Sequence, residues 1–448
     1  MVQRIAYLPI EKRAREFTSK CLIASELVRA GVTVVIGYSA AMLANFNQFP
    51  PGVVCVKGLN RVQYNTINQL PSLGHKVVAI DEEALGALDP AFMMRDCWPE
   101  TQPYIDKVFC QGPVHKSAFI EFRKFTLAQT PITGNPRIDM LRPPFIDAIR
   151  ENVARIRQEH GEFILINTDS GSINGTIPQL DKYLKVLVQI GWIDPNSPED
   201  VALFEEHIEH DRNNIAAIED FARAMKAELP DRRLILRPHP AEDPAHWERV
   251  AREVGNLTVV TNTNATEWIL AADCLIQTGC TTGVEAAVMG IPTIGLVRQP
   301  EDFLHPKVRL SNWLNPIVRD PSEVVEAIRQ LSSGQQETFG ANREEKLRSL
   351  APHIHIDPDE FSYQKIGRLI EAEMSADSPD QQKPVNSIQE PVESYLRGNI
   401  IGSLFKEARF SQADLERTLR WIYTTQNQTR DFAIDDLGWS MYKVRPAD

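Results

Sequence analysis

The sequence predicts an α/β protein that is built from two doubly wound halves, and three observations lead to this prediction. Short, continuous apolar runs recur along the chain, and amphipathic stretches of helical length separate them. Such runs are typical of parallel strands that are buried on both faces, and helical connections between them imply βαβ units. The series pauses once, at turn-rich residues 133–144, and then restarts. The 448 residues are enough for two or three domains.

Each half has its own series of expected strands. A first helix is expected at 16–30, where Gly31 ends it, and a helix-rich stretch with a loop near Asp194 is expected at about 171–230. The expected strands are 5–9, 32–36, 53–56, 76–80 and 107–110 in the first half, and 163–166, 234–236, 257–260, 274–276, 292–296 and 316–318 in the second.

The domain boundaries follow from this series and from composition. We expect a first α/β domain at 1–145, a second at 146–372, a polar linker at 373–393 and a C-terminal helical segment at 394–448. Two helices, 394–410 and 413–425, are expected in that last segment.

Composition excludes several classes of protein. The formal net charge is −12 and the pI is about 5.4, which disfavours binding to nucleic acid. No window approaches the roughly 20 apolar residues that cross a bilayer, and the first thirty residues do not resemble a signal peptide. The six cysteines form no C-x-x-C pair, so neither a zinc site nor a disulfide framework is expected. We therefore expect a cytoplasmic protein without a bound metal.

The strongest local motif is a proline-flanked histidine directly after an expected strand. Arg237, His239 and Pro240 follow the strand at 234–236. Ligands of open α/β sheets bind at the carboxyl ends of strands, and an imidazole or guanidinium placed there can donate to a phosphate. The alternative is that His239 only caps the next helix.

A second motif joins the strand at 274–276 to a helix. Gly279 and Gly283 allow close approach of the backbone, while Thr281, Thr282 and the first N–H groups of the helix can form an anion site. Glu285 lies in the first helical turn, where it can accept ribose hydroxyls. An ordinary N-cap explains one threonine and the glutamate but neither the glycines nor the second threonine.

Together the two motifs resemble a known family. The pairing of Arg-Pro-His-Pro with Thr-Gly-Cys-Thr-Thr-Gly-Val-Glu-Ala is similar to GT-B surface-carbohydrate biosynthesis proteins, which are related to bacterial sialyl- and polysialyltransferases, capsule Kdo transferases and polyglycerol-phosphate polymerases. Residues 8–16 and 133–139 are also similar, and the resemblance spans about 1–335. It implies two Rossmann-like domains that face a cleft. It also implies that His239-Pro240, Thr281 and Thr282 contact the phosphate and sugar of a CMP-activated donor.

The resemblance also draws attention to an acidic cluster in the first half. Asp81, Glu82 and Glu83 directly follow the strand at 76–80, and an inverting transferase needs a carboxylate base for its acceptor hydroxyl. Related transferases have an acidic pair followed by glycine, whereas here two residues separate the acids from Gly86. Three acids that open a helix are also favourable partners of its dipole. The identity of the base stays open, with Glu82 and Glu83 ahead of Asp81.

Two loops complete the candidate site. Thr168 and Ser170 follow the first strand of the second half, where GT-B proteins approach the donor phosphate, although surface loops have the same composition. Glu11, Arg13 and Glu16, together with Arg15, follow the strand at 5–9 and could line the acceptor side. An exposed, charged helix start is the alternative.

These observations lead to three functional hypotheses. The first is a metal-independent glycosyltransferase without a bound cofactor. It would move a nonulosonic or Kdo-like acid from a nucleotide sugar, which the resemblance implies is CMP-linked. The acceptor would be a surface polysaccharide of the capsule or lipopolysaccharide type, or a lipid-linked precursor. The second is a UDP-sugar 2-epimerase, whose Gly-Gly-rich stretch with Gln-Glu-Glu is absent here. The third is a degenerate GT-B scaffold in surface-glycan assembly. Residues 397–410 and 421–423 could contact the inner face of a membrane, or pack on the core.

Overall fold

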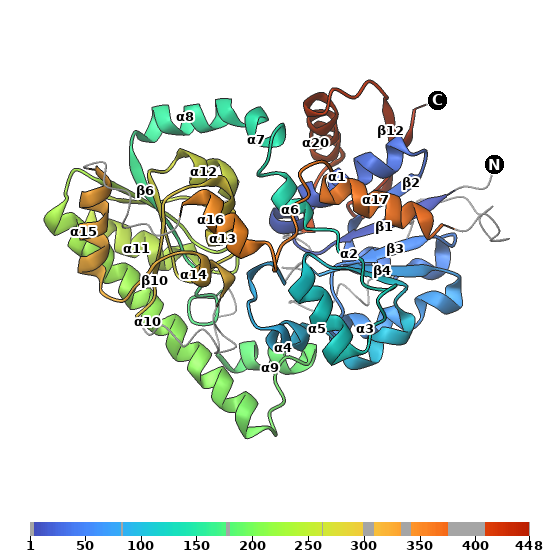
Figure 1. Cartoon of the computed structure of the whole chain (residues 1–448), viewed down its shortest axis with the longest axis horizontal. Helices are drawn as coiled ribbons and strands as arrows, with labels where there is room; N and C mark the ends of the chain where they lie inside the picture. The colour runs from blue at the N-terminus through green and yellow to red at the C-terminus, as the bar shows by residue number, and fades with distance from the viewer. Residues whose placement is uncertain are drawn as a thin grey trace. The chain divides into compact units, whose positions relative to one another are not determined.

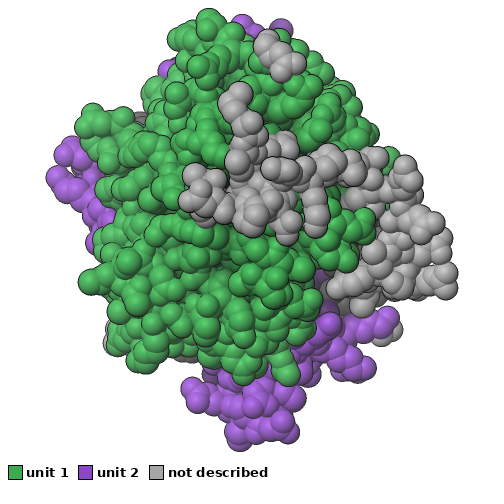
Figure 2. All heavy atoms as spheres, turned by 90° about the vertical axis from the view of Figure 1, so that its right-hand side faces the viewer, with its two compact units in different colours: residues 1–82, 96–145, 354–448 green, residues 83–95, 146–353 purple. Residues whose placement is uncertain are grey.

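The computed structural model describes residues 4–81, 84–175, 180–261, 263–298, 309–332, 342–374 and 408–447. The chain divides into two compact units, which Figure 2 colours separately. Unit 1 consists of Met1–Glu82, Asp96–Phe145 and Ile354–Asp448, and unit 2 of Glu83–Arg95 and Ile146–His353. In the part of the chain that the structure describes, no helix has the length and apolar character needed to cross a membrane.

Unit 1 contains a seven-stranded sheet with the order β12-β13-β2-β1-β3-β4-β5. The five strands from the start of the chain are parallel, while β13 runs antiparallel to β2, and β12 to β13. The strands are β1 (Ile5–Ile10), β2 (Thr33–Tyr38), β3 (Val53–Val56), β4 (Lys76–Ile80), β5 (Lys107–Phe109), β12 (Phe432–Gly438) and β13 (Met441–Pro446).

Three helices from distant parts of the sequence form one layer over this sheet. Apolar residues of α1, α17 and α20 join those of the strands in a single core (Figure 1). The helical elements of this unit are α1 (Arg13–Arg29), α2 (Ser39–Leu43), η1 (Phe46–Gln48), α3 (Arg61–Ile67), η2 (Leu70–Leu73), η5 (Pro99–Tyr104), α5 (Pro113–Arg123), α6 (Pro136–Asp139), α17 (Ser362–Ala372) and α20 (Gln412–Thr425). A short helix, η4 (Met94–Asp96), begins in unit 2 and ends in unit 1.

Unit 2 contains a six-stranded, fully parallel sheet with the order β11-β10-β9-β6-β7-β8. The order reverses direction at β6, as in doubly wound sheets. The strands are β6 (Phe163–Asn167), β7 (Arg233–Arg237), β8 (Leu257–Val259), β9 (Cys274–Gln277), β10 (Thr293–Leu296) and β11 (Ile317–Val318).

Helices cover both faces of the unit 2 sheet. Residues of α10, α11 and α15 form the core on one face, and residues of α8, α12 and α13 form it on the other. The helical elements are η3 (Ala84–Gly86), α4 (Pro90–Met93), α7 (Phe145–Ala148), α8 (Arg150–His160), α9 (Leu180–Ile190), α10 (Pro198–Glu228), α11 (Pro244–Val254), α12 (Ala265–Ala271), α13 (Thr282–Met289), α14 (Leu310–Leu314), α15 (Pro321–Ser332) and α16 (Arg343–Leu350).

The expected α/β architecture with two parallel-rich sheets is confirmed. Every strand expected in the two halves is present within two residues of its expected ends, and the helix expected at 413–425 is α20. The helix-rich stretch with a loop near Asp194 corresponds to α9 and α10. The helix expected at 394–410 lies outside the described residues except for its last three positions, as does most of the expected linker.

The C-terminal segment, which we expected to be helical, also contains strands. Residues 432–446 form the antiparallel hairpin β12–β13, which adds to the edge of β2. An edge strand presents unpaired N–H and C=O groups, so a short hairpin can gain backbone hydrogen bonds there. The contacts also place residues 354–372 with unit 1 and residues 84–95 with unit 2, whereas the sequence suggested continuous domains.

Candidate functional site

Three adjacent strands of unit 2 end next to one another. The order β9-β6-β7 places the loops after Gln277, Asn167 and Arg237 along one edge of the sheet. These loops carry the two motifs that the sequence singled out, together with the loop of Thr168 and Ser170. The carboxyl edge is where an open α/β sheet binds its ligand.

His239 is held by the backbone of its own turn. The N–H of Ala241 donates to Nδ1 over 3.2 Å, so a neutral ring carries its proton on Nε2, which is then a donor. The following helix, α11, has Asp243 as its N-cap, whose carboxylate accepts from the N–H of Ala245. The helix cap is therefore Asp243 and not His239, which removes the simpler explanation for the histidine.

Arg237 is anchored to the loop that follows β8. Its Nε donates to Thr263 Oγ1 over 2.8 Å, and Nη2 donates to Thr263 O over 3.0 Å. Burial lowers the pKa of this guanidinium from its usual value, and nearby Glu285 acts in the opposite direction. Two of its donor groups are thus already engaged, and a phosphate-binding role stays a prediction.

Thr281 and Thr282 stand at the start of α13. The side chain of Thr281 makes no capping hydrogen bond although it occupies the N-cap position, so ordinary capping does not account for its hydroxyl. Asn167 Nδ2 donates to Thr282 Oγ1 over 3.0 Å, which ties the end of β6 to this helix. The N–H groups of Gly283 and Val284 donate to the carbonyls of Cys280 and Thr281, so the first turn offers fewer backbone donors than expected.

The two glycines of this motif have different roles. Gly279 has a φ of +118°, a region that favours glycine. A Cβ atom on Gly283 would lie 2.8 Å from Ser311 Cβ, so this glycine allows α13 and α14 to pack closely. Buried Glu285 lies in the first turn of α13, and its proposed contact with ribose stays a prediction.

The loop after β6 is fastened by a residue that the sequence analysis missed. Thr168 Oγ1 and the N–H of Ser170 both donate to Glu242 Oε1, over 2.7 and 3.0 Å. Thr168 and Ser170 are buried, so these donors are engaged by Glu242. The sequence offered one clue, because Glu242 lies three residues after His239, in an acidic pair with Asp243.

Several buried polar atoms at this edge have no protein partner among the described residues. They are Asn167 Oδ1, Asn214 Oδ1 and Thr278 Oγ1. Asn214 Nδ2 itself donates to Thr278 O over 3.5 Å, so two of these groups are neighbours. Buried polar atoms normally find a hydrogen-bond partner, which can be water or a ligand.

Unit 1 places Asp81 at the end of β4 beside a second histidine that the sequence analysis missed. His115, on α5, is only 1% exposed. Its Nδ1 accepts from the N–H of Gln111 over 3.2 Å, and its Nε2 lies 3.4 Å from Asp81 Oδ2. Because Nδ1 accepts a hydrogen bond, the ring is neutral and carries its proton on Nε2. Nε2 is close to the carboxylate but makes no hydrogen bond with it.

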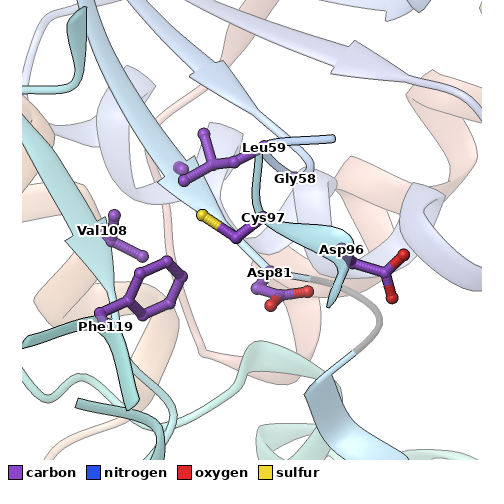
Figure 3. Close-up of a pocket in the computed structure, with 8 residues that line it drawn as sticks. Gly58, Leu59, Asp81, Asp96, Cys97, Val108 and Phe119 are labelled. Atoms are coloured by element: carbon purple, nitrogen blue, oxygen red, sulfur yellow. The ribbon is translucent and has the colours of Figure 1, made fainter. Parts of the chain in front are cut away.

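Figure 3 shows the recess next to Asp81. Leu59, Val108 and Phe119 line it together with Asp81 and Asp96. The space is too narrow for a water molecule, so it is a packed strand end and not a binding cavity. The ring of Phe119 also lies 4.9 Å from that of His115, measured between centroids.

The structure describes the glycine of this cluster but not its other two acids. Glu82 and Glu83 lie outside the described residues. Gly86 belongs to unit 2, where a Cβ atom on it would lie 3.0 Å from Thr281 Cγ2. Thus the glycine that seemed displaced in the sequence packs against the threonine motif.

The charged cluster after β1 serves mainly to start α1. Glu16 is fully buried and accepts from the N–H groups of Glu11 and Lys12, each over 3.0 Å. Lys57 Nζ lies 2.8 Å from Glu11 Oε2, and Arg13 pairs with Asp414. Glu16 is therefore neither part of an exposed helix start nor open to an acceptor.

The apolar residues of the C-terminal segment pack on unit 1. Phe410, Ile422 and Tyr423 belong to its core, and Trp421 packs against that core. For these described residues, packing on the core is confirmed. Within the described ranges, no group of three or more His, Cys, Asp or Glu side chains could hold a metal ion.

Comparisons with known proteins give a fold but no family. No family model matches the sequence, and no curated protein matches it. Among solved structures, the wall teichoic acid polymerase TagF soaked with CDPG has a TM-score of 0.53 and 12% identity, over 84% of this chain and 89% of that one. TagF in another structure gives 0.51 and 13%, over 84% and 90%. UDP-GlcNAc 2-epimerase of Methanocaldococcus jannaschii, in complex with UDP-GlcNAc and UDP, gives 0.48 and 11%, over 83% and 99%.

At these identities the likeness shows the fold alone. The chain has the GT-B fold of TagF, with two parallel-rich α/β units. What it binds and what it transfers must therefore be argued from its own residues.

Proposed function

We propose that the chain is a glycosyltransferase that uses a cytidine-nucleotide-activated donor and an acceptor that is a surface glycan or its lipid-linked precursor. The observation that carries the proposal is the meeting of three strand ends in unit 2. They bring the Nε2 donor of His239 and the hydroxyls of Thr281 and Thr282 to one edge of the sheet. The matching fold of TagF supports the same class of enzyme.

On the donor side, His239 would stabilise the departing phosphate. As the donor is cleaved, negative charge grows on the phosphate oxygens, and a fixed N–H donor stabilises that charge more than the ground state. The backbone of Ala241 fixes the ring. Thr281 and Thr282 would orient the phosphate at the positive end of the α13 dipole.

On the acceptor side, Asp81 is the proposed base among the described acids. Its carboxylate lies at the carboxyl end of β4, with His115 Nε2 3.4 Å away. The buried ring limits the positions that this carboxylate can take, and proton abstraction requires a positioned base. Glu82 and Glu83 remain alternatives from the sequence.

A second candidate is transfer of a phosphopolyol from a CDP-linked donor. It is favoured by one finding, namely that a TagF structure with the same fold was soaked with CDPG. Both candidates place a cytidine nucleotide in unit 2, and they differ in the bond that breaks. Release of CMP occurs in either reaction, so the product attached to the acceptor must be identified by mass spectrometry.

The test is a thermal-shift screen of the whole chain against CMP, CDP, UDP and GDP. A ligand that binds only the folded state stabilises it by about 2.7 kcal/mol at 100 times its Kd, so CMP or CDP should raise the melting temperature. No shift with any nucleotide contradicts the proposal. Free epimerised UDP-sugar without an acceptor would instead support an epimerase, and binding without hydrolysis or transfer would support a scaffold. We also propose that transfer needs no metal, so EDTA should leave it unchanged.

A further inference from the structure

We infer that Glu242 is a positioning residue that holds the loop 168–174 against the His239 turn, so that the donor nucleotide meets both in a fixed arrangement. This inference rests on the proposed function for its ligand, but the arrangement itself is independent of it. Glu242 is a charged side chain with only 3% exposure. Such a group is costly to bury unless hydrogen bonds compensate for the water it loses.

Four donors compensate for that burial. Oε1 accepts from Thr168 Oγ1 and from the N–H of Ser170. Oε2 accepts from Trp247 Nε1 over 2.8 Å and from Asn174 Nδ2 over 3.3 Å. Three of these donors belong to the loop after β6, and the fourth belongs to α11. The carboxylate therefore joins the loop to the helix that follows the His239 turn.

The backbone of Glu242 makes the same connection. Its N–H donates to His239 O over 2.8 Å, and the N–H of Asp243 donates to Asn174 O over 2.7 Å. Gly175 and Glu242 also form an isolated antiparallel bridge. Hydrogen bonds thus join both the beginning and the end of the loop 168–174 to Glu242 and Asp243. A displacement of the loop would therefore move the backbone that carries His239.

Only a group that accepts at both oxygens fits this position. An ionised carboxylate is acceptor-only, whereas a glutamine amide has two donor hydrogens on its nitrogen. In Glu242→Gln, Oε1 can still accept from Thr168 and Ser170. The NH₂ group then faces the donors of Trp247 and Asn174 and cannot accept from them. The opposite orientation turns it toward the N–H of Ser170. Either way, buried donors lose their acceptor, which is more costly than the loss of an average hydrogen bond.

The experiment combines amide hydrogen exchange with calorimetric binding of CDP, on the whole chain. In Glu242→Gln, we expect the amide of Ser170 to exchange at least about tenfold faster and the Kd for CDP to rise about tenfold or more. The matched control is Glu248→Gln, which removes the same charge from an exposed position of α11. It should change neither measurement.

A second substitution tests whether the hydrogen-bond pattern is responsible. Asn174→Asp alone would place two carboxylates opposite each other and weaken CDP binding. Combined with Glu242→Gln, it offers an acceptor to the new NH₂ group, so the double variant should bind CDP more tightly than either single variant. If Glu242→Gln does not fold, Thr168→Val removes one donor and leaves the carboxylate, and Ser170 exchange should still rise.

The outcomes separate this inference from the proposed function. Unchanged exchange at Ser170 and an unchanged Kd in Glu242→Gln would overturn the positioning role, even with tight binding by the wild type. Faster exchange with unchanged CDP binding would also overturn it, because the loop would then be fastened without serving the nucleotide. A wild type that binds no CDP would contradict the proposed function, and with it any positioning of this nucleotide, while Ser170 exchange would still report on the contacts of Glu242.

Discussion

The carboxyl edges of the two sheets are built differently. In unit 2, side-chain hydrogen bonds join three loops, through Glu242 between the loops after β6 and β7, and through Asn167 and Thr282 between β6 and α13. In unit 1, Asp81 and His115 stand beside a recess lined by Leu59, Val108 and Phe119. The hydrogen-bond network of unit 2 fixes several groups at once, whereas unit 1 offers one carboxylate beside one imidazole ring. The first arrangement suits an anion with several oxygens, and the second suits the removal of one proton.

The largest effect is expected at His239, on the carboxyl edge of the unit 2 sheet, where we propose that the donor binds. In His239→Asn, the amide oxygen can still accept the N–H of Ala241, but no atom replaces Nε2. We expect the turnover of the nucleotide donor to fall by about 10²- to 10³-fold, as for the loss of one transition-state donor. Steady-state kinetics should show the loss mainly in kcat, with an unchanged melting temperature.

The control for this variant is His246→Asn, on α11 of the same unit, where the ring pairs with Glu219 over 3.1 Å. It should keep its activity. Equal activities of the two variants would show that His239 does not act on the donor. The difference between the two sheet edges would then be unrelated to catalysis.

The next largest effect is expected at Asp81, on the carboxyl edge of the unit 1 sheet, where we propose that the acceptor is activated. Asp81→Asn keeps the size of the side chain but removes the proton acceptor, so transfer should fall by about 10²-fold while nucleotide binding is kept. Asp359→Asn, an exposed position of unit 1, is the matched control. A fully active Asp81→Asn enzyme would indicate that Glu82 or Glu83 is the base.

His115 should give a smaller effect than Asp81. His115→Asn can keep an acceptor for the N–H of Gln111 but loses the group that faces Asp81. We expect about a tenfold loss in kcat, since the variant disturbs the orientation of the base and not its charge. The pH profile of kcat should also change. A profile that keeps its shape would show that His115 only packs against Phe119.

The last prediction concerns stability and pH, at Asp211 on α10. Burial raises the pKa of Asp211 to about 8, nearby Asp169 and Glu242 also raise it, and hydrogen bonds from Ser172 oppose this. An unfolded-chain aspartate has a pKa of about 3.9. The folded protein therefore holds a proton that the unfolded chain releases, and the stabilisation that is present below about pH 4 is lost as the pH rises to about 8.

Asp211→Asn has no such proton and supplies the comparison. Relative to this variant, the wild type should lose about 1.4 kcal/mol of unfolding free energy per pH unit up to about pH 8, and then no more. Urea denaturation at pH 5 to 9 measures this difference, with Asp181→Asn as an exposed control. A difference that does not vary with pH would show that Asp211 is ionised in the fold.

The parallel strands of both sheets could be predicted from the sequence, and the hairpin could not. Continuous apolar runs such as 163–166 are buried on both faces and have few alternative structures. The hairpin β12–β13 alternates only weakly and contains Asp435 and Asp436, so its stability depends on pairing with β2, four hundred residues earlier. Local sequence cannot indicate a partner at that separation.

The candidate site divides in the same way. His239 and Thr281 could be predicted because position at a strand end follows from the strand itself. Glu242, His115 and Asn167 could not, since their roles arise from contacts with residues that are distant in sequence, such as Thr168 or Thr282. The sequence predicted close approach at Gly283, but it could not indicate that Ser311 is the residue packed there.

The discontinuity of unit 1 has a consequence for biosynthesis. The strands of unit 2 all lie between residues 163 and 318, so a ribosome can deliver that sheet as one uninterrupted stretch. The helix α1, by contrast, gains α17 and α20 as neighbours only when residues 362–425 have been made. Until then the nascent first unit carries uncovered apolar surface. Molecular chaperones therefore have their longest opportunity to act on the part of the chain that is translated first.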